Sequence, residues 1–283
     1  MFEIIKDAFY ITKGRIILLQ PLIIFLLVTT FATLPLKSLS SSPLAFFAVL
    51  LNLLLLSVAF CCGWFGMVKK AILTFDKKEM NNHSSADDIK LFKEFFPSVG
   101  EYFLPACGAF LILGIISTLF SILIFKVGTH FFANTDLLAQ MFNQTMMPID
   151  KQREFLTSLS DTELLTLNKY IFYFAFFYFL FNIMFLFFPA ILFLKTKNPF
   201  KVIFQSICCA FKKPLLTIGI YFYLMIIGFV VSALGMLGNL NLLLSLITLF
   251  ITLLYFSNYI VVIFLSYEQH FNCDNRSNCE RKD

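Results

Sequence analysis

Long apolar segments alternate along the chain with short polar ones, and six of the apolar segments are long enough to cross a bilayer. A helix needs about 20 apolar residues to span roughly 30 Å of hydrocarbon. None of the six contains Asp, Glu, Lys, Arg or His: they are residues 16–36, 44–68, 102–125, 170–194, 215–237 and 240–267. Pro21 marks a place where the first of them can kink. The pattern predicts an all-α, polytopic membrane protein with six transmembrane helices.

Shorter amphipathic stretches precede the first, third and fifth apolar segments. They are residues 2–12, 88–96 and 200–211. In the third stretch, Phe200, Phe204, Ile207 and Phe211 follow the 3.6-residue spacing that builds one apolar helix face. The sequence therefore predicts three transmembrane hairpins, each preceded by an interfacial amphipathic helix. The alternative remains open that these are the polar juxtamembrane helices of any polytopic protein.

The predicted elements give one transmembrane domain, residues 1–267, with a polar cytoplasmic tail at residues 268–283. Residues 126–169 form the longest loop, in which Asp136 and Asp150 are suited to begin short helices. Ser160 and Glu163 have the spacing of a capping box at the start of the fourth transmembrane helix.

The basic residues are divided unevenly between the two sides of the predicted membrane. Of 22 lysines and arginines, those on the side away from the termini are Lys37, Lys126, Lys151, Arg153 and Lys169. Because Lys and Arg accumulate in cytoplasmic loops, both termini are predicted inside and residues 126–169 outside. A bacterial cell membrane fits this distribution, and so does a eukaryotic endomembrane.

Composition narrows the classes further. With 59% hydrophobic and 14% charged residues and a mean hydropathy of +0.83, the chain departs strongly from soluble domains. The net charge of +5 is too dispersed to indicate nucleic acid as a partner. Seven cysteines without regular spacing argue against a secreted disulfide scaffold.

No motif for catalysis, metal or cofactor binding stands out, so we expect no catalytic site, no metal site and no cofactor. The apolar segments hold no Asp, Glu, Lys, Arg or His. A charged residue inside a span is the usual sign of intramembrane chemistry. The tail residues His270, Cys273 and Cys279 leave open a zinc site with fewer than the usual four ligands.

Two sets of residues are candidates for contacts of another kind. Basic residues that border the first and third amphipathic stretches are placed to contact lipid head groups: Lys13, Arg15, Lys212 and Lys213. Amides within the apolar segments are suited to bonds between helices, or to lining a pathway: Gln20, Asn52, Asn182 and Asn258. Small residues at Ala59, Gly63 and Gly66 have the spacing that permits close helix packing.

Two segments carry a family resemblance. The first is residues 200–214, an amphipathic helix ended by Lys212, Lys213 and Pro214, and the second is residues 59–67, with Gly63, Trp64 and Gly66. The chain resembles a group of bacterial six-helix membrane proteins of unknown function. That group includes the membrane domain attached to some glycerophosphodiester phosphodiesterases. The resemblance implies membrane residence and no catalytic residues, and the chain has no phosphodiesterase domain.

The leading hypothesis is a non-catalytic membrane module that interacts with membrane lipids, a partner protein or a second copy of itself. A transporter or channel for a neutral or lipid-like substrate is the alternative, with the four amides converging on one cavity. A third possibility is an interfacial lipid enzyme in which Glu101 or Asp136 acts as acid or base.

Overall fold

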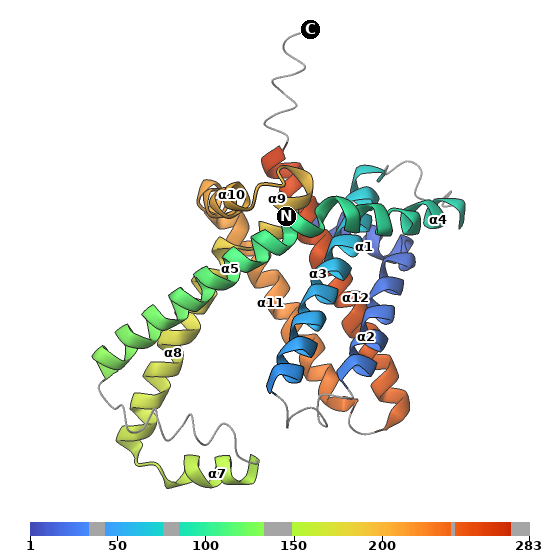
Figure 1. Cartoon of the computed structure of the whole chain (residues 1–283). Helices are drawn as coiled ribbons and strands as arrows, with labels where there is room; N and C mark the ends of the chain where they lie inside the picture. The colour runs from blue at the N-terminus through green and yellow to red at the C-terminus, as the bar shows by residue number, and fades with distance from the viewer. Residues whose placement is uncertain (34–42, 76–84, 133–148, 239–240, 273–283) are drawn as a thin grey trace. The chain divides into compact units, whose positions relative to one another are not determined.

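The computed structural model describes residues 1–33, 43–75, 85–132, 149–238 and 241–272 (Figure 1). Within these ranges the ordered elements are all helices, with no strand among them, so the all-α prediction is confirmed there. The chain divides into two compact units. Unit 1 combines Met1–Leu111 with Met184–Asp283, and unit 2 is Ile112–Ile183.

Unit 1 opens with a sharp bend. Helix α1 (Phe2–Gly14) leads through the short 3₁₀ helix η1 (Ile16–Leu18) into α2 (Leu19–Thr33), and the two parts meet at 84°. The bend falls at Arg15, whose backbone leaves the helical conformation, and not at Pro21. Pro21 lies in the first turn of α2, where a missing backbone N–H breaks no helical hydrogen bond.

Helix α3 (Pro43–Leu73) packs against α2 and η1. The rings of Phe25 and Phe60 stack with their centroids 4.3 Å apart. One turn further along α3, the indole N–H of Trp64 donates to the carbonyl oxygen of Leu18 at 3.0 Å. Because this carbonyl lies in η1, the hydrogen bond ties the bend to α3.

The next two helices meet at a break. Helix α4 (Ser85–Lys93) ends before Glu94, and α5 (Phe95–Phe132) starts directly after it. The predicted interfacial stretch 88–96 therefore runs over the ends of two helices. Phe96 is 73% exposed and Ile89 is 57% exposed, so this segment presents apolar side chains outward.

The predicted span 170–194 is divided as well. Helix α8 (Asp161–Met184) stops short of α9 (Phe188–Leu194). Pro189 occupies the first turn of α9, where its missing N–H breaks no helical hydrogen bond. Helix α9 is almost entirely buried.

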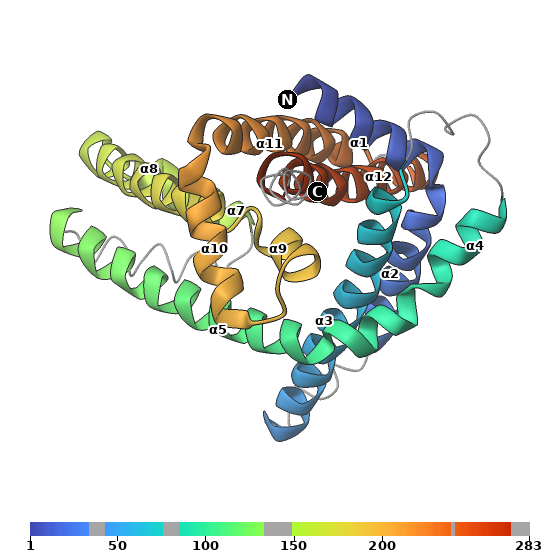
Figure 2. The ribbon, with the colours of Figure 1, turned by 90° about the horizontal axis from the view of Figure 1, so that it is seen from above.

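Three longer helices follow in the described part of unit 1. The side chain of Asn198 caps α10 (Pro199–Lys212), and α11 (Pro214–Leu237) and α12 (Leu242–Tyr267) follow, with one π-helical turn, η4 (Glu268–Asn272), at the end. Helices α11 and α12 lie side by side, with α1 against α12 (Figure 2). Tyr255 Oη donates to the carbonyl oxygen of Leu224 at 2.9 Å.

The core of unit 1 lies at one end of its long helices, the upper end in Figure 1, where α1, α9 and η4 also lie. The two largest groups of buried side chains in it come from Val58 to Ile72 on α3 and from Leu253 to Tyr267 on α12. The other halves of both helices expose large apolar residues, such as Leu44 (83%) and Leu242 (78%). Such extended apolar surface is typical of contact with a membrane.

Unit 2 contains the later part of α5, helix α7 (Ile149–Ser158) and most of α8. Ser121 Oγ and Tyr178 Oη are 2.6 Å apart, which joins α5 to α8. The predicted capping box is confirmed: Ser160 N–H donates to Glu163 Oε2 at 2.9 Å, and Glu163 N–H to Ser160 Oγ at 3.4 Å. The helix expected near Asp136 lies outside the described residues.

Among the described residues, five helical segments are long and apolar enough to cross a membrane, or six when the bent α1–α2 pair counts as one span. Four of the five agree in place with predicted apolar segments 44–68, 170–194, 215–237 and 240–267. The fifth, Asp88–Phe131, is longer than the predicted 102–125 because it includes α4.

Candidate functional site

A polar depression in the described part of unit 1 lies between α3, Glu94 and the start of α5. Gly66 allows this approach, because a Cβ at that position would collide with the side chain of Ser98 on α5. Ser98 is buried, with 3% exposure. The pair Gly66 and Ser98 thus forms the floor on which charged residues from both helices converge.

Tyr102 of α5 is the centre of a short hydrogen-bond chain. Lys69 Nζ on α3 donates to Tyr102 Oη at 2.8 Å, and Tyr102 Oη donates to the carbonyl oxygen of Phe193 on α9 at 3.3 Å. The rings of Tyr102 and Phe193 stack with centroids 4.4 Å apart. Tyr102 is only 4% exposed, so these hydrogen bonds fix Lys69 relative to α5 and α9.

A second cation reaches the same tyrosine. Lys197, between α9 and α10, pairs with Glu101 at 2.9 Å and lies 5.1 Å from the centroid of the Tyr102 ring, which Lys69 also faces at 5.3 Å. The hydrogen bond to Glu101 raises the pKa of Lys197. Both partners of this ion pair are about half exposed, so its net contribution to stability is small.

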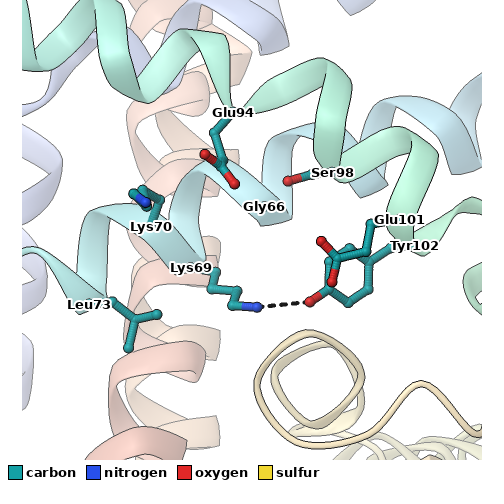
Figure 3. Close-up of a pocket in the computed structure, with 8 residues that line it drawn as sticks. All are labelled: Gly66, Lys69, Lys70, Leu73, Glu94, Ser98, Glu101 and Tyr102. Carbon is teal, nitrogen blue, oxygen red and sulfur yellow. Dashed lines mark hydrogen bonds between the residues drawn. The ribbon is translucent and has the colours of Figure 1, made fainter.

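The pocket beside this cluster has a volume of about 200 Å³. Figure 3 shows the side chains around it, with Glu94 and Ser98 approaching from the α4–α5 side and the lysines from α3. The polar residues that line it are Lys69, Lys70, Glu94, Ser98, Glu101 and Tyr102. Two ammonium groups and two carboxylates therefore border one small space.

Lys70 and Glu94 are the charged residues of this pocket that remain available to bind a ligand. Neither side chain forms a hydrogen bond or ion pair with another described residue, whereas Glu101 is paired with Lys197. Lys69 uses one of its three donors on Tyr102. The pocket can accordingly offer donors from α3 and a carboxylate from Glu94 to a small polar group.

The structure separates the four basic residues predicted to contact head groups. Lys13 is exposed near the end of α1. Arg15 is 7% exposed and donates through Nη1 to the carbonyl oxygen of Ala71 and to Thr74 Oγ1, both at 2.9 Å. The guanidinium of Arg15 therefore donates hydrogen bonds to groups at the C-terminal end of α3 and is turned away from the surface.

The two lysines after α10 also differ. Lys212 is exposed at the end of the helix. Lys213 Nζ donates to the carbonyl oxygen of His270 at 3.0 Å and lies 5.7 Å from the centroid of the Phe271 ring. Lys213 thus links the α10–α11 junction to η4.

The four predicted amides, Gln20, Asn52, Asn182 and Asn258, lie on four different helices, α2, α3, α8 and α12. Asn52 Nδ2 donates to the carbonyl oxygen of Ala48 and Asn182 Nδ2 to that of Tyr178, each one turn earlier in its own helix at 2.8 Å. Gln20 is exposed and lies two residues after Leu18, whose carbonyl oxygen accepts the hydrogen bond from the Trp64 indole. Asn52 is twelve residues before Trp64, a distance of roughly 18 Å along α3 at 1.5 Å per residue.

Sequence reasoning placed Lys69, Lys70, Glu101 and Lys197 on one side of the membrane but did not connect them. The only local signal was the pair of glycines in α3, which predicted a close packing partner without naming it. In the described part of the chain, no three His, Cys, Asp or Glu side chains are placed to share a metal ion. Cys273 and Cys279 lie outside the described residues.

Fold and site together define a helical membrane protein with a small, charged pocket at the end of its core. No family model matches the chain. Comparisons with curated proteins and with solved structures likewise found no match. The resemblance of residues 59–67 and 200–214 to six-helix bacterial membrane proteins therefore stays a prediction.

Proposed function

We propose that the chain is a non-catalytic membrane module that binds lipid head groups at the cytoplasmic leaflet through its interfacial helices and their lysines. In this proposal it has six spans arranged as three hairpins, lies in the cell membrane and keeps both termini in the cytoplasm.

Helix α10 is the observation that carries the proposal. Its buried side includes Val202, Ser206 and Ala210, which pack inward. The opposite side exposes Phe200 (72%), Phe204 (69%) and Phe211 (70%). A helix already packed on the protein gains nothing in water from exposing three phenylalanines, whereas at a bilayer surface they enter the boundary between head groups and acyl chains.

The other two interfacial segments repeat this arrangement. On α1, Phe2 and Phe9 are 84% and 56% exposed and are seven residues apart, while Ile4 and Ala8 are buried. On the α4–α5 segment, Ile89 and Phe96 have the same spacing and are exposed. Seven residues make two helical turns, so Phe2 and Phe9 lie on one face of α1. Ile89 and Phe96 lie on either side of the break at Glu94, and both are exposed.

Exposed lysines accompany these faces, which favours anionic lipids. Lys13 and Lys201 are exposed on α1 and α10, and Lys212 ends α10. Each lysine near an anionic membrane surface contributes about 1 kcal/mol of attraction. The three together are sufficient to enrich anionic lipid at this end of unit 1.

The test compares two triple variants of the full chain in nanodiscs of phosphatidylcholine with phosphatidylglycerol. One variant is Lys13→Gln, Lys201→Gln, Lys212→Gln. Its matched control is Lys126→Gln, Lys151→Gln, Lys169→Gln, which removes three exposed lysines from the side predicted to face outward.

Native mass spectrometry counts the phosphatidylglycerol that each protein retains. We expect the first variant to lose anionic-lipid binding by tenfold or more, and the control to retain it. Equal retention in both variants would contradict the proposal. Co-purification of a stoichiometric protein partner with the wild type, lost in the first variant, would assign the same face to a protein instead.

A further inference from the structure

The charged pocket next to Tyr102 contains more kinds of charged group than general attraction to anionic lipid requires. Attraction to anionic lipid requires only lysines, yet this pocket is lined by Glu94 and Glu101 as well as by Lys69 and Lys70. The carboxylates would repel a simple phosphate, and the lysines would repel a simple cation. Charges of both signs facing one space favour a ligand that carries both signs itself.

The size of the pocket restricts that ligand further. A volume of about 200 Å³ equals the share of roughly seven water molecules, at about 30 Å³ each. This accommodates a phosphate joined to a short amine, and it is too small to enclose a folded peptide.

The aromatic content of the pocket distinguishes between two kinds of ammonium. A quaternary ammonium such as choline is bound by several aromatic faces around it. Among the described lining residues only Tyr102 is aromatic, and Lys69 and Lys197 already face its ring. A primary ammonium instead donates hydrogen bonds, which the carboxylate of Glu94, with no hydrogen-bond or ion-pair partner among the described residues, can accept.

The segment that carries Glu94 also reaches the proposed membrane surface. Phe96 follows Glu94 by two residues and is 73% exposed, and Ile89 lies five residues before it and is 57% exposed. With these side chains in the interface, the break between α4 and α5 lies at head-group depth. A phospholipid of the same leaflet can then place its polar end in the pocket.

We propose that the pocket bordered by Lys69, Lys70 and Glu94 binds the phosphoethanolamine group of a phospholipid, with the phosphate toward the lysines and the ammonium toward Glu94. This inference rests on the proposed function, because it uses the cytoplasmic leaflet as the source of the ligand. It adds selection of one head group to a general attraction for anionic lipid.

The experiment presents the full chain with equal amounts of dioleoyl phosphatidylethanolamine, phosphatidylcholine and phosphatidylglycerol in detergent, and native mass spectrometry counts the lipids retained. Pocket variants are Glu94→Gln and Lys70→Gln. Controls are Glu154→Gln and Lys151→Gln, which remove one charge of each sign from exposed residues of α7. Thermal melting of each variant establishes that it is folded.

We expect the wild type and both controls to retain phosphatidylethanolamine over phosphatidylcholine by roughly tenfold, the effect of one charge-assisted hydrogen bond. Glu94→Gln should abolish this preference and increase retention of phosphatidylglycerol, because the pocket gains net positive charge. Lys70→Gln should weaken retention of all three lipids. Equal retention of the three lipids by the wild type, or an unchanged preference in Glu94→Gln, would overturn the inference.

A parallel arm adds soluble phosphoethanolamine as a competitor. Displacement of the lipid at millimolar concentration supports the same chemistry with the membrane as its source. Binding of the soluble ester in the absence of any retained phosphatidylethanolamine would overturn the assignment to a lipid. Failure of this inference is distinguishable from failure of the proposed function, because the latter depends on Lys13, Lys201 and Lys212, none of which lines the pocket.

Discussion

At the scale of single residues, Gly66 decides whether the charged pocket exists. The small residues of α3 predicted close packing from their spacing, but the partner helix could not be inferred, since any neighbouring helix would satisfy the pattern. The structure supplies Ser98 of α5 as the contact. The requirement for glycine was therefore predictable and the site that it creates was not.

Replacing Gly66 with Ala tests this contact. We expect a destabilisation of about 1–3 kcal/mol, because the new Cβ overlaps the Ser98 side chain and α3 and α5 must move apart. Gly100→Ala is the control, since a Cβ on Gly100 meets nothing within 4 Å and alanine favours a helix. Thermal melting in detergent compares the two. A melting temperature of Gly66→Ala equal to that of Gly100→Ala would contradict the packing described.

Arg15 shows the limit of counting charges. By position it is equivalent to Lys13, and the sequence offered both as head-group contacts. Burial separates them, because Arg15 donates to the backbone of Ala71 and to the Thr74 hydroxyl at the end of α3, whereas Lys13 is exposed. Sequence alone did not reveal which of two neighbouring cations would turn inward at the 84° bend.

The two cations should respond differently to neutralisation. We expect Arg15→Gln to lower the free energy of unfolding by about 2 kcal/mol, since hydrogen bonds from a buried charged donor are lost. Lys13→Gln should change it by less than about 0.5 kcal/mol, as an exposed substitution does. Melting curves in the same detergent check both. The account of the bend is wrong if the two variants melt together.

At the scale of elements, local signals were predictable and breaks were not. The capping box of Ser160 and Glu163 was identified from a four-residue pattern because both partners are close in sequence. The break at Glu94 and the one between α8 and α9 lie inside or beside apolar runs that read as continuous. Where such a run is divided depends on tertiary contacts, which the pattern of one segment does not contain.

Helix α10 gives the sharpest test at this scale. Cys208 is exposed on α10, between Phe204 and Phe211. If this face lies in the bilayer interface, a charged, membrane-impermeant thiol reagent should modify Cys208 slowly in proteoliposomes. The triple variant Phe200→Ser, Phe204→Ser, Phe211→Ser should increase that rate several-fold, because the apolar contribution to interfacial binding is removed.

Peptide mapping by mass spectrometry separates Cys208 from the neighbouring Cys209, which is buried and whose pKa is raised by burial. Cys209 should stay unmodified in both proteins and so reports that the helix remains folded. Rapid modification of Cys208 in the wild type would place α10 in water and contradict its interfacial assignment.

At the scale of the whole molecule, the sequence predicted which loops lie on one side but not which loops meet. The positive-inside rule groups Lys69, Glu101 and Lys197 by side. It gives no neighbours within that side, and these depend on how several helices pack. The contacts of Tyr102 with Lys69 and of Glu101 with Lys197 are therefore information that only the structure provides.

The proposed orientation can be tested with reporter fusions to the chain. A fluorescent protein fused after Asp283 should fold and fluoresce, because we place the C-terminus in the cytoplasm. Alkaline phosphatase fused after Ser160 should be active, because it needs an extracytoplasmic location, and the same enzyme fused after Lys197 should be inactive. The reverse pattern of activities would invert the topology and remove the charged pocket from the cytoplasmic leaflet.

The most direct test of the central claim is to cut the protein out of its expression membrane in copolymer nanodiscs and to compare the enclosed lipids with the bulk membrane. We predict enrichment of phosphatidylethanolamine and anionic lipid around the wild type. The anionic enrichment should be lost in the Lys13→Gln, Lys201→Gln, Lys212→Gln variant and the phosphatidylethanolamine enrichment in Glu94→Gln. A wild-type nanodisc whose lipids match the bulk membrane would contradict the account.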